Sequence, residues 1–185
     1  LTFAQYQLLG YVRPEKKGKY ADKYGDTWGK DFESQVHRTA AVANLMRVNV
    51  LKRMESSVNS FRITLERILG ACTSMRDRLD NIGSSVSYET SGWDGEFDDD
   101  DDAEEFASGG KVQVDLRDVD ALRLGEDLDY DIAKLNVLLD YARQVTPERD
   151  AKLQQLKAFI ADKATNPYNP GNSKVLVFRD RKSVG

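Results

Sequence analysis

The chain has 185 residues, 31% of them charged and 40% hydrophobic, and its 27 Lys and Arg against 31 Asp and Glu give a net charge of −4. This length fits one domain, and no apolar run approaches the ~20 residues that a bilayer requires, which excludes a membrane-spanning protein. The lone Cys72 excludes an intramolecular disulfide and a CxxC metal site and favours a reducing compartment, the cytoplasm. Because the chain begins with Leu1 and shows no signal-peptide pattern, we interpret it as a fragment of a longer protein.

Residues 1–31, which we expect to pass from irregular to helical structure, interleave aromatic and basic side chains. Tyr20, Tyr24, Trp28 and Phe32 are spaced four residues apart, and the lysines among them are Lys16, Lys17, Lys19, Lys23 and Lys30. This pattern suits the stacking of nucleic-acid bases, but a spacing of four is equally typical of a helical packing face. Both interpretations stay open.

Residues 32–83 are predicted to be one long helical segment. Apolar residues recur at steps of three or four, and no Pro or Gly occurs between Phe32 and Leu69; the stripe consists of Met46, Val50, Met54, Val58, Phe61, Leu65 and Ile68. An unbroken helix of that extent would be roughly 50 Å long and would resemble a strut between two bodies. Gly70 either ends this helix or lies within it, and Gly83 is a second candidate for its C-terminal end.

Basic residues punctuate the same segment and outnumber the acidic ones between them, namely Arg38, Arg47, Lys52, Arg53, Arg62 and Arg67 against Glu33, Glu55 and Glu66. A positive strip of this kind could hold a nucleic-acid backbone. The alternative is an ordinary solvated helix face with pairs such as Arg62 and Glu66.

Residues 84–111 read as an acidic disordered loop. Nine carboxylates and no basic residue lie between Asp94 and Glu105, and serines and glycines surround them. A like-charged run repels itself and cannot bury apolar surface. A calcium-binding loop fails on spacing, because Ala103 follows Asp98, Asp100 and Asp102 and Gly109 stands where the closing Glu belongs.

Residues 112–165 are predicted to form an antiparallel helical pair. The first helix carries an apolar stripe after an acidic first turn, and the stripe is Leu128, Ile132, Leu135, Leu138, Leu139, Ala142 and Val145. Thr146 and Pro147 suit the N-cap and first position of the second helix, whose apolar face is Leu153, Leu156, Phe159 and Ile160. The pair is expected to pack on the long first helix.

Residues 166–185 begin with a turn rich in Asn, Pro and Gly and continue with the apolar run 174–178. This run predicts a strand buried on both faces, of the kind that opens a parallel sheet. A strand of that kind needs neighbours, so we expect an adjoining α/β domain.

The sequence lacks the residues of several common active sites. No G-x-x-x-x-G-K-[ST] phosphate loop occurs, and the single histidine, His37, lies on a polar helical turn without a visible partner. Cys72 is flanked by Ala71 and Thr73 and is interpreted as a packing residue. There is no metal-binding constellation.

Residues 45–69, LMRVNVLKRMESSVNSFRITLERIL, resemble a block of bacterial DEAD/DEAH-box helicases of the Swi/Snf-like (HepA-like) branch of superfamily two. That block, close to L-x-R-x-x-L-L-K-R-L-E-S-S-x-x-A-F-R-x-T-L, follows the first RecA-like lobe. The matching residues are Leu45, Arg47, Leu51, Lys52, Arg53, Glu55, Ser56, Ser57, Phe61, Arg62, Thr64 and Leu65, and the departures are Met54 and Ser60. Residues 174–178 look like the first strand of the family's second lobe, although Arg179 and Asp180 replace its usual Thr and acidic residue. Residues 1–14 resemble the exit from the first lobe.

The resemblance implies a mainly α region between the two lobes of a DNA- or RNA-dependent ATPase. ATP and Mg²⁺ would then bind to lobes outside these 185 residues, and no catalytic residue is carried over. The basic residues Arg47, Lys52, Arg53 and Arg62 would contact the nucleic-acid backbone or pin the lobes, and Glu55, Ser56 and Ser57 would pack against a lobe.

We therefore interpret the chain as the helical connector of an ATP-dependent helicase or translocase, inactive as an ATPase when isolated. The rival is a stand-alone helical protein-interaction module whose acidic loop solvates it or mimics DNA. A third hypothesis, an independent nucleic-acid binder, predicts affinity that falls steeply with salt.

Overall fold

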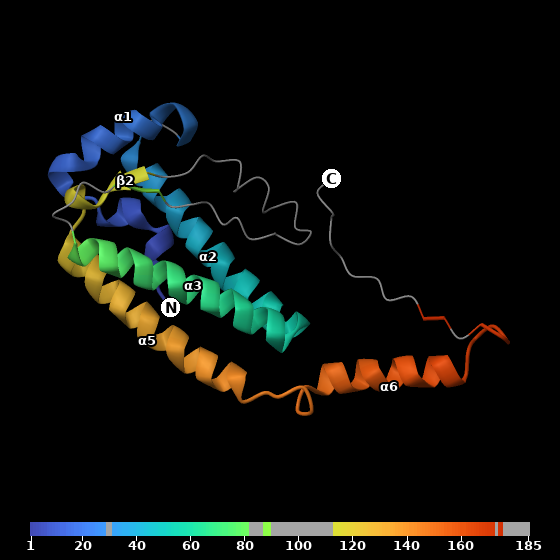
Figure 1. The fold of residues 1–185 in the computed structure, drawn as a ribbon. Coiled ribbons are helices and arrows are strands. Elements are labelled where there is room, and N and C mark those ends of the chain that lie inside the picture. Colours follow the sequence, from blue (N-terminus) through green and yellow to red (C-terminus); the bar gives the residue numbers. More distant parts are fainter. Residues whose placement is uncertain (29–30, 82–86, 90–112, 173, 176–185) are drawn as a thin grey trace.

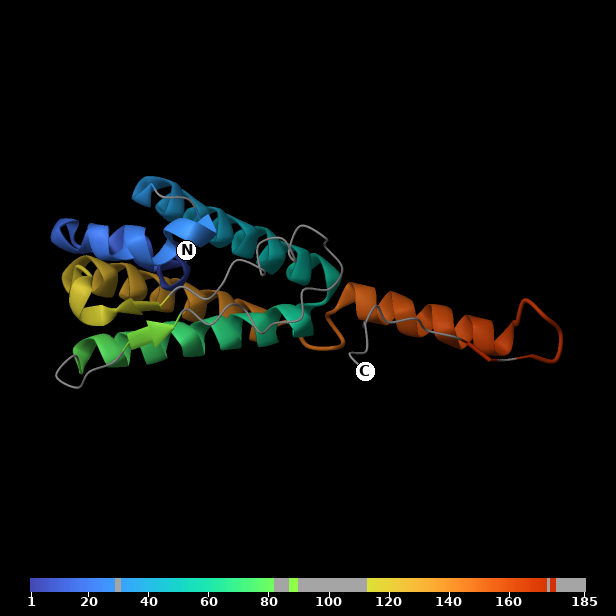
Figure 2. The same ribbon diagram turned by 90° about the horizontal axis from the view of Figure 1, so that it is seen from above.

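The computed structural model describes residues 1–28, 31–81, 87–89, 113–172 and 174–175, the side chains of residues 25–28 and 87–89 excepted. Within these ranges the chain is mainly helical, which confirms the predicted class. Three long helices form the body, α2 (Phe32–Ser56), α3 (Val58–Asp80) and α5 (Ala121–Arg143), and α3 runs antiparallel to both of the others (Figure 1). Seen from above, α6 (Ala151–Thr165) extends beyond the end of this body (Figure 2).

The predicted long helix is wrong, because the chain reverses at Ser57 and forms a hairpin of α2 and α3. Ser57 is extended, with φ −159° and ψ 128°, and its side chain accepts a hydrogen bond from the Ser60 backbone N–H as the N-cap of α3. The reversal lets the two halves of the apolar stripe face each other: Met46 and Val50 on one side and Leu65 and Ile68 on the other are all buried. Helix α3 crosses Gly70 and ends at Asp80.

Helix α2 begins where the sequence predicted, and α5 begins earlier than expected. Asp31 caps α2 by accepting a hydrogen bond from the backbone N–H of Ser34. Asp120 caps α5 in the same way, by accepting a hydrogen bond from the backbone N–H of Arg123. Of the acidic residues expected in the first turn of this helix, Glu126 and Asp127 therefore lie in its second turn and Asp129 in its third. Most of the predicted stripe of α5 is buried against α3, which confirms the expected packing of this helix on the first helical segment.

Of the N-terminal segment, residues 1–16, the part up to Val12 packs into the body, whereas Arg13, Pro14 and Glu15 are exposed. Three short 3-10 turns follow one another, η1 (Ala4–Tyr6), η2 (Leu8–Tyr11) and η3 (Pro14–Lys16). Phe3, Ala4, Leu8 and Leu9 are at most 2% exposed, and the turns contact α2, α3 and α5. The first residues of the chain therefore form part of the hydrophobic core between helices that are distant from them in the sequence.

A buried carboxylate on α5 fixes this segment. Asp131, which is 1% exposed, accepts hydrogen bonds from the backbone N–H of Thr2, from Thr2 Oγ1 at 2.8 Å and from the backbone N–H of Ala4 at 3.1 Å. Thr2 and Ala4 flank Phe3, whose φ of 57° and ψ of 44° lie in the left-handed region that residues with a Cβ seldom adopt. Asp131 thus holds the backbone on both sides of a strained residue.

Helix α1 (Lys17–Trp28) packs on α2, and hydrogen bonds of Tyr20 and Tyr24 join it to one strand of a short antiparallel ribbon. The ribbon pairs β1 (Ser87–Glu89) with β2 (Gln113–Asp115), in a register that places Ser87 opposite Asp115. The turn η4 (Leu116–Asp118) leads from β2 toward α5, and an isolated bridge joins Val12 to Val119. The two ends of the acidic stretch therefore meet beside α1; apart from β1, the predicted loop 84–111 lies outside the described residues.

The predicted antiparallel helical pair is also wrong. Residues 146–150 form a turn, with the backbone N–H groups of Arg149 and Asp150 both donating to the Thr146 carbonyl, and Asp150 caps α6 in place of Thr146. Helix α6 then leads away from the body instead of folding back on α5 (Figures 1 and 2). None of its side chains is buried. Of the predicted strand 174–178, residues 176–178 lie outside the described residues.

Among the described helices, none combines the length and the apolar character that crossing a membrane requires.

Asp131→Ala should lower the free energy of unfolding by about 3 kcal/mol, because it leaves the Thr2 and Ala4 N–H groups buried without acceptors. Urea denaturation followed by circular dichroism measures the change. Asp129→Ala is the matched control on the same helix, where an exposed ion pair with Arg76 is worth less than about 1 kcal/mol. Equal losses in the two variants would contradict the role of Asp131.

Candidate functional site

The residues of the helicase-like block gather around the turn between α2 and α3. Glu55 and Ser56 end α2, Ser57 caps α3, and Arg53 and Arg62 lie within two turns on either side. Glu55 and Ser56 are exposed and Ser57 is half-buried. The Glu55 backbone carbonyl accepts a hydrogen bond from the Nζ of Lys152 in the first turn of α6, so this end of the hairpin adjoins the helix that leaves the body.

Arg47 is engaged by the N-terminal segment. Its Nε and Nη2 donate to the Leu1 carbonyl at 3.4 and 3.2 Å, and its guanidinium lies 5.9 Å from the centroid of the Phe3 ring. Another bond joins Arg47 Nη1 to the side chain of Asn44. Together with Asp131, Arg47 therefore fixes the first three residues of the chain to the body.

The other basic candidates do not form one strip with Arg47. Lys52 is exposed, Arg53 and Arg62 are half-buried, and Arg62 Nη2 donates to Asn59 Oδ1 at 2.8 Å. At about 100° of rotation per residue, Arg47, Lys52 and Arg53 leave α2 about 100–140° apart. The basic residues predicted from the sequence lie near the hairpin end, and the helix geometry directs them to different sides.

Exposed apolar side chains accompany these charges. Val48, Leu51 and Met54 on α2 are 47%, 55% and 47% exposed, and Ile63 on α3 is 40% exposed. Met54 belonged to the predicted core stripe; it is exposed because the chain turns away before a partner reaches it. The end of the hairpin therefore presents a mixed apolar and basic surface.

The described aromatic side chains of the four-residue pattern, Tyr20, Tyr24 and Phe32, form a packing face. Tyr20 and Tyr24 are 1% and 9% exposed, and Phe32 is buried too. The Tyr24 hydroxyl donates to the Gln113 carbonyl at 2.9 Å and accepts from its N–H at 2.6 Å, which ties α1 to β2. Of the two readings of the four-residue spacing, the packing face is the one that the described side chains adopt.

Asp118 is the second buried carboxylate, 6% exposed, and lies where α1 meets η4. Burial alone would favour its neutral form, but hydrogen bonds from Lys19 Nζ at 2.6 Å and Tyr20 Oη at 2.8 Å outweigh burial and hold the pKa of Asp118 below its ordinary value. Lys16 adds a weaker ion pair at 3.8 Å. Asp118 thus partly neutralises Lys16 and Lys19.

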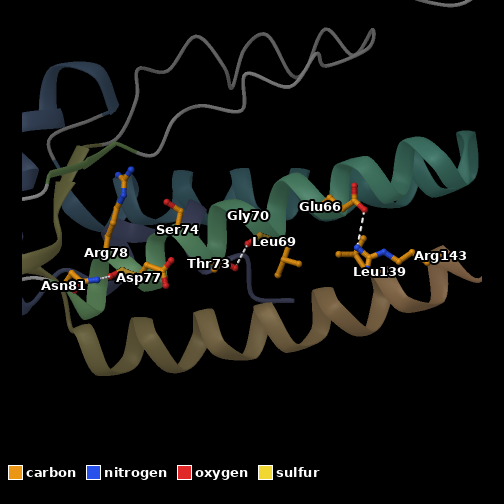
Figure 3. A pocket seen from close by; sticks show the side chains of 10 residues that line it. All are labelled: Glu66, Leu69, Gly70, Thr73, Ser74, Asp77, Arg78, Asn81, Leu139 and Arg143. Carbon is orange, nitrogen blue, oxygen red and sulfur yellow. Dashed lines mark hydrogen bonds and ion pairs between the residues drawn. The ribbon is translucent and has the colours of Figure 1, made fainter.

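A groove of about 590 Å³ lies between α3 and α5 (Figure 3). Its walls carry both charge signs, with Glu66 and Asp77 against Arg78 and Arg143, and Glu66 pairs with Arg143 at 3.4 Å across it. Gly70, Thr73 and Ser74 line the side formed by α3. The balanced charges and open shape give this groove no preference for a ligand of one sign.

Cys72 is sealed in the core. Its thiol donates to Gln5 Oε1, and burial, with a smaller contribution from the charge of Asp131, raises its pKa to about 12. A thiol that does not ionise near neutral pH is a poor nucleophile, which agrees with the packing role predicted for Cys72. His37 is exposed on α2, and the described residues contain no group of three side chains able to hold a metal ion.

Sequence reasoning missed Asp118 and Asp131. A signal for Asp131 was present, because Leu124, Leu128, Asp131 and Leu135 follow the helical period and so place a carboxylate in an apolar stripe. No comparable signal marked Asp118. Comparison with protein-family models, curated proteins and solved structures yields no match for this chain.

The Asp118 carboxylate makes the fold sensitive to acid. Its folded-state pKa lies below the ordinary 3.8, so it stabilises the fold above that pH and loses its contribution as the pH falls below it. Asp118→Asn should therefore flatten the decline of unfolding free energy below pH 4, measured by urea titrations at a series of pH values. Asp140→Asn, an equal charge change on an exposed part of α5, should keep the wild-type slope; an unchanged slope in Asp118→Asn would contradict the assignment.

Proposed function

We propose that this chain is the helical connector between the two lobes of a cytoplasmic, ATP-dependent nucleic-acid helicase or translocase of the Swi/Snf-like branch. The proposal rests on the resemblance of residues 45–69. That block corresponds to the hairpin around Ser57, which ends α2 and starts α3. An exposed helical hairpin is a suitable lever between two moving bodies.

The structural observation that supports the proposal is the difference in burial between the N-terminal segment and α6. Residues up to Val12 pack into the body, whereas α6 buries no side chain and leads away from the body. A connector needs one end fixed to its own body and the other free to join a second one.

Within this proposal the basic residues have different roles. Arg47 secures the N-terminal segment through Leu1 and Phe3, at the junction with the first lobe. Lys52, Arg53 and Arg62 contact the phosphate backbone of DNA or RNA, where positive side chains position the nucleic acid without reading its sequence. Glu55, Ser56 and Ser57 form the contact with the second lobe, in line with the bond from Lys152 to the Glu55 carbonyl.

ATP and Mg²⁺ would be held by the flanking lobes. The phosphate loop that binds them needs a Gly-rich turn followed by Lys and Ser or Thr, which this sequence does not contain. The chain would position the two lobes and transmit motion between them, and it would supply no chemical group to ATP hydrolysis.

The exposed apolar side chains at the hairpin end favour a second candidate, a helical protein-interaction module. Leu51, at 55% exposed, is the most accessible of them, flanked by Val48 and Met54. Apolar patches at an exposed tip typically mark protein contacts. In this reading the basic residues form the polar rim of a protein interface.

The double variant Arg53→Ala/Arg62→Ala, made in the full-length gene product, should weaken DNA stimulation of ATP hydrolysis. For each phosphate contact removed, the slope of log affinity against log salt should fall by about one. ATPase titrations with DNA at several salt concentrations measure it.

Lys134→Ala, which removes a cation from the exposed side of α5, is the matched control and should leave the slope unchanged. Wild-type stimulation in the double variant would overturn the assigned contacts. Absence of any DNA-stimulated hydrolysis in the wild-type protein would favour the interaction module.

A further inference from the structure

Helix α3 exposes one side along most of its length. Ile63, Gly70 and Ser74 form the middle line of this side, because they are separated by seven and then four residues and so leave the helix in nearly the same direction. They are exposed although α2 and α5 pack on other sides of the same helix. This side is named the α3 face, and it borders the groove between α3 and α5 (Figure 3).

The charges of the α3 face are sorted by sign. At about 100° of rotation per residue, Glu66 and Asp77 leave the helix on one side of the middle line, and Arg67 and Arg78 leave it on the other. All four side chains are exposed, and Asp77 and Arg78 point to different sides of α3 in Figure 3. Glu66 pairs with Arg143 of α5, which places the acidic edge next to the groove. The α3 face therefore has one acidic edge and one basic edge.

Gly70 lies in the middle of this face, where its own helix gains nothing from a glycine. Glycine stabilises a helix interior less than alanine does. A Cβ at Gly70 would meet no atom within 4 Å among the described residues, so packing inside the chain does not require a glycine. A missing side chain does let another backbone come close. Gly70 and the adjoining groove of about 590 Å³, lined by Leu69 and Leu139, leave room for a further helix.

A second copy of the chain brings a helix with matching charges. If two α3 faces meet across a two-fold axis parallel to the helices, the acidic edge of each copy lies against the basic edge of the other. If the axis is perpendicular to the helices, each edge meets its own equivalent and like charges oppose one another. The sorted charges therefore favour parallel pairing. A partner that carries both signs also suits a groove whose walls carry both signs.

We propose that the α3 face is a homodimer interface, in which α3 of a second copy lies parallel to α3 and against the groove between α3 and α5. Glu66 then approaches Arg67 of the second copy, and Asp77 approaches Arg78 of the second copy. A two-fold axis parallel to a helix keeps every residue level with its own equivalent, so the two middle lines lie side by side. The pairing requires neither ATP nor nucleic acid and goes beyond the proposed function.

Cysteine variants of the full-length gene product test the parallel geometry. Ile63 and Ser74 lie about 16 Å apart along the middle line. Ile63→Cys and Ser74→Cys should each form a disulfide with the same position of a second copy under mild oxidation. Lys134→Cys is the matched control and should stay unlinked, because Lys134 is exposed on a side of α5 that points away from the groove. Peptide mass spectrometry identifies the linked positions, and buried Cys72 does not compete.

Several results of this experiment would overturn the proposal. They are no link from either variant, equally fast linking of Lys134→Cys, and a link at one of the two positions alone. The last result would indicate antiparallel pairing, because a disulfide does not bridge the distance between positions 63 and 74. A monomeric Ser74→Cys variant whose new thiol resists alkylation would also contradict the proposal, and would assign the α3 face to another segment of the same chain.

Sedimentation equilibrium of the unlinked protein tests the charge pairing. Arg67→Glu places an acidic residue on the basic edge and should raise the dimer dissociation constant by about ten-fold. Adding Glu66→Lys exchanges the two edges at this level and should restore most of the affinity. Lys134→Glu, an equal change of charge outside the α3 face, should leave the constant unchanged. Absence of rescue by Glu66→Lys, or an equal loss in Lys134→Glu, would refute the pairing.

Gly70→Lys separates the interface from the fold. Lysine favours a helix more than glycine does and meets open space in the single chain, so the melting temperature should stay constant or rise. In the dimer two lysines would face each other at the middle line, and the dissociation constant should rise by at least about ten-fold. Ala133→Lys, exposed on α5 away from the groove, is the control and should dimerise like the wild type. An unchanged dissociation constant in Gly70→Lys would contradict the close approach at this residue.

Discussion

The body of this protein depends on how Asp131 holds the first residues of the chain. The contact joins residues separated by 129 positions in the sequence, and it fixes Thr2 and Ala4 around a left-handed Phe3. Without the N-terminal turns, α2, α3 and α5 would face a void where Phe3, Leu8 and Leu9 now lie. The helices therefore need the segment as core, and the segment needs the helices to adopt its strained backbone. Because the helices and the N-terminal segment need each other, we expect them to fold cooperatively. The contact that joins them links residues far apart in the sequence, and contacts of this kind slow folding.

The sequence predicted which faces are apolar but not where the chain turns. The stripe from Met46 to Ile68 keeps its helical period through Ser57, and neither Pro nor Gly marks the reversal. A serine that can cap a helix can equally remain inside one, so the decision falls to tertiary packing: a hairpin buries both halves of the stripe against each other, whereas a single long helix would leave them in water. The stripes of α5 and α6 look alike in sequence for the same reason, and they differ in burial only because α3 covers one of them.

For the candidate residues too, the sequence predicted the residue type but not the direction in which each side chain leaves its helix. The basic residues near the hairpin end were recognisable from composition and spacing, yet Arg47 is committed to Leu1 and Phe3 while Lys52 is exposed on another side of α2. For Tyr20 and Tyr24, the four-residue period left stacking and packing equally suitable. The choice between them came from β2, whose backbone groups meet the Tyr24 hydroxyl. The sequence predicts which residues are neighbours on the same helix, but it does not predict which residues of distant segments contact them.

The ribbon of β1 and β2 makes the chain tolerant of length variation at one place. Glu89 pairs with Gln113, and Tyr24 together with Lys23 holds Gln113 against α1, so both boundaries of the intervening stretch are secured by groups outside it. The entropic cost of closing a loop between two fixed ends grows only logarithmically with the number of its residues, by about 0.6 kcal/mol per doubling. Evolution can therefore lengthen, shorten or recharge this stretch almost independently of the helices, and a fluorescent or affinity insert placed there would report on the intact body.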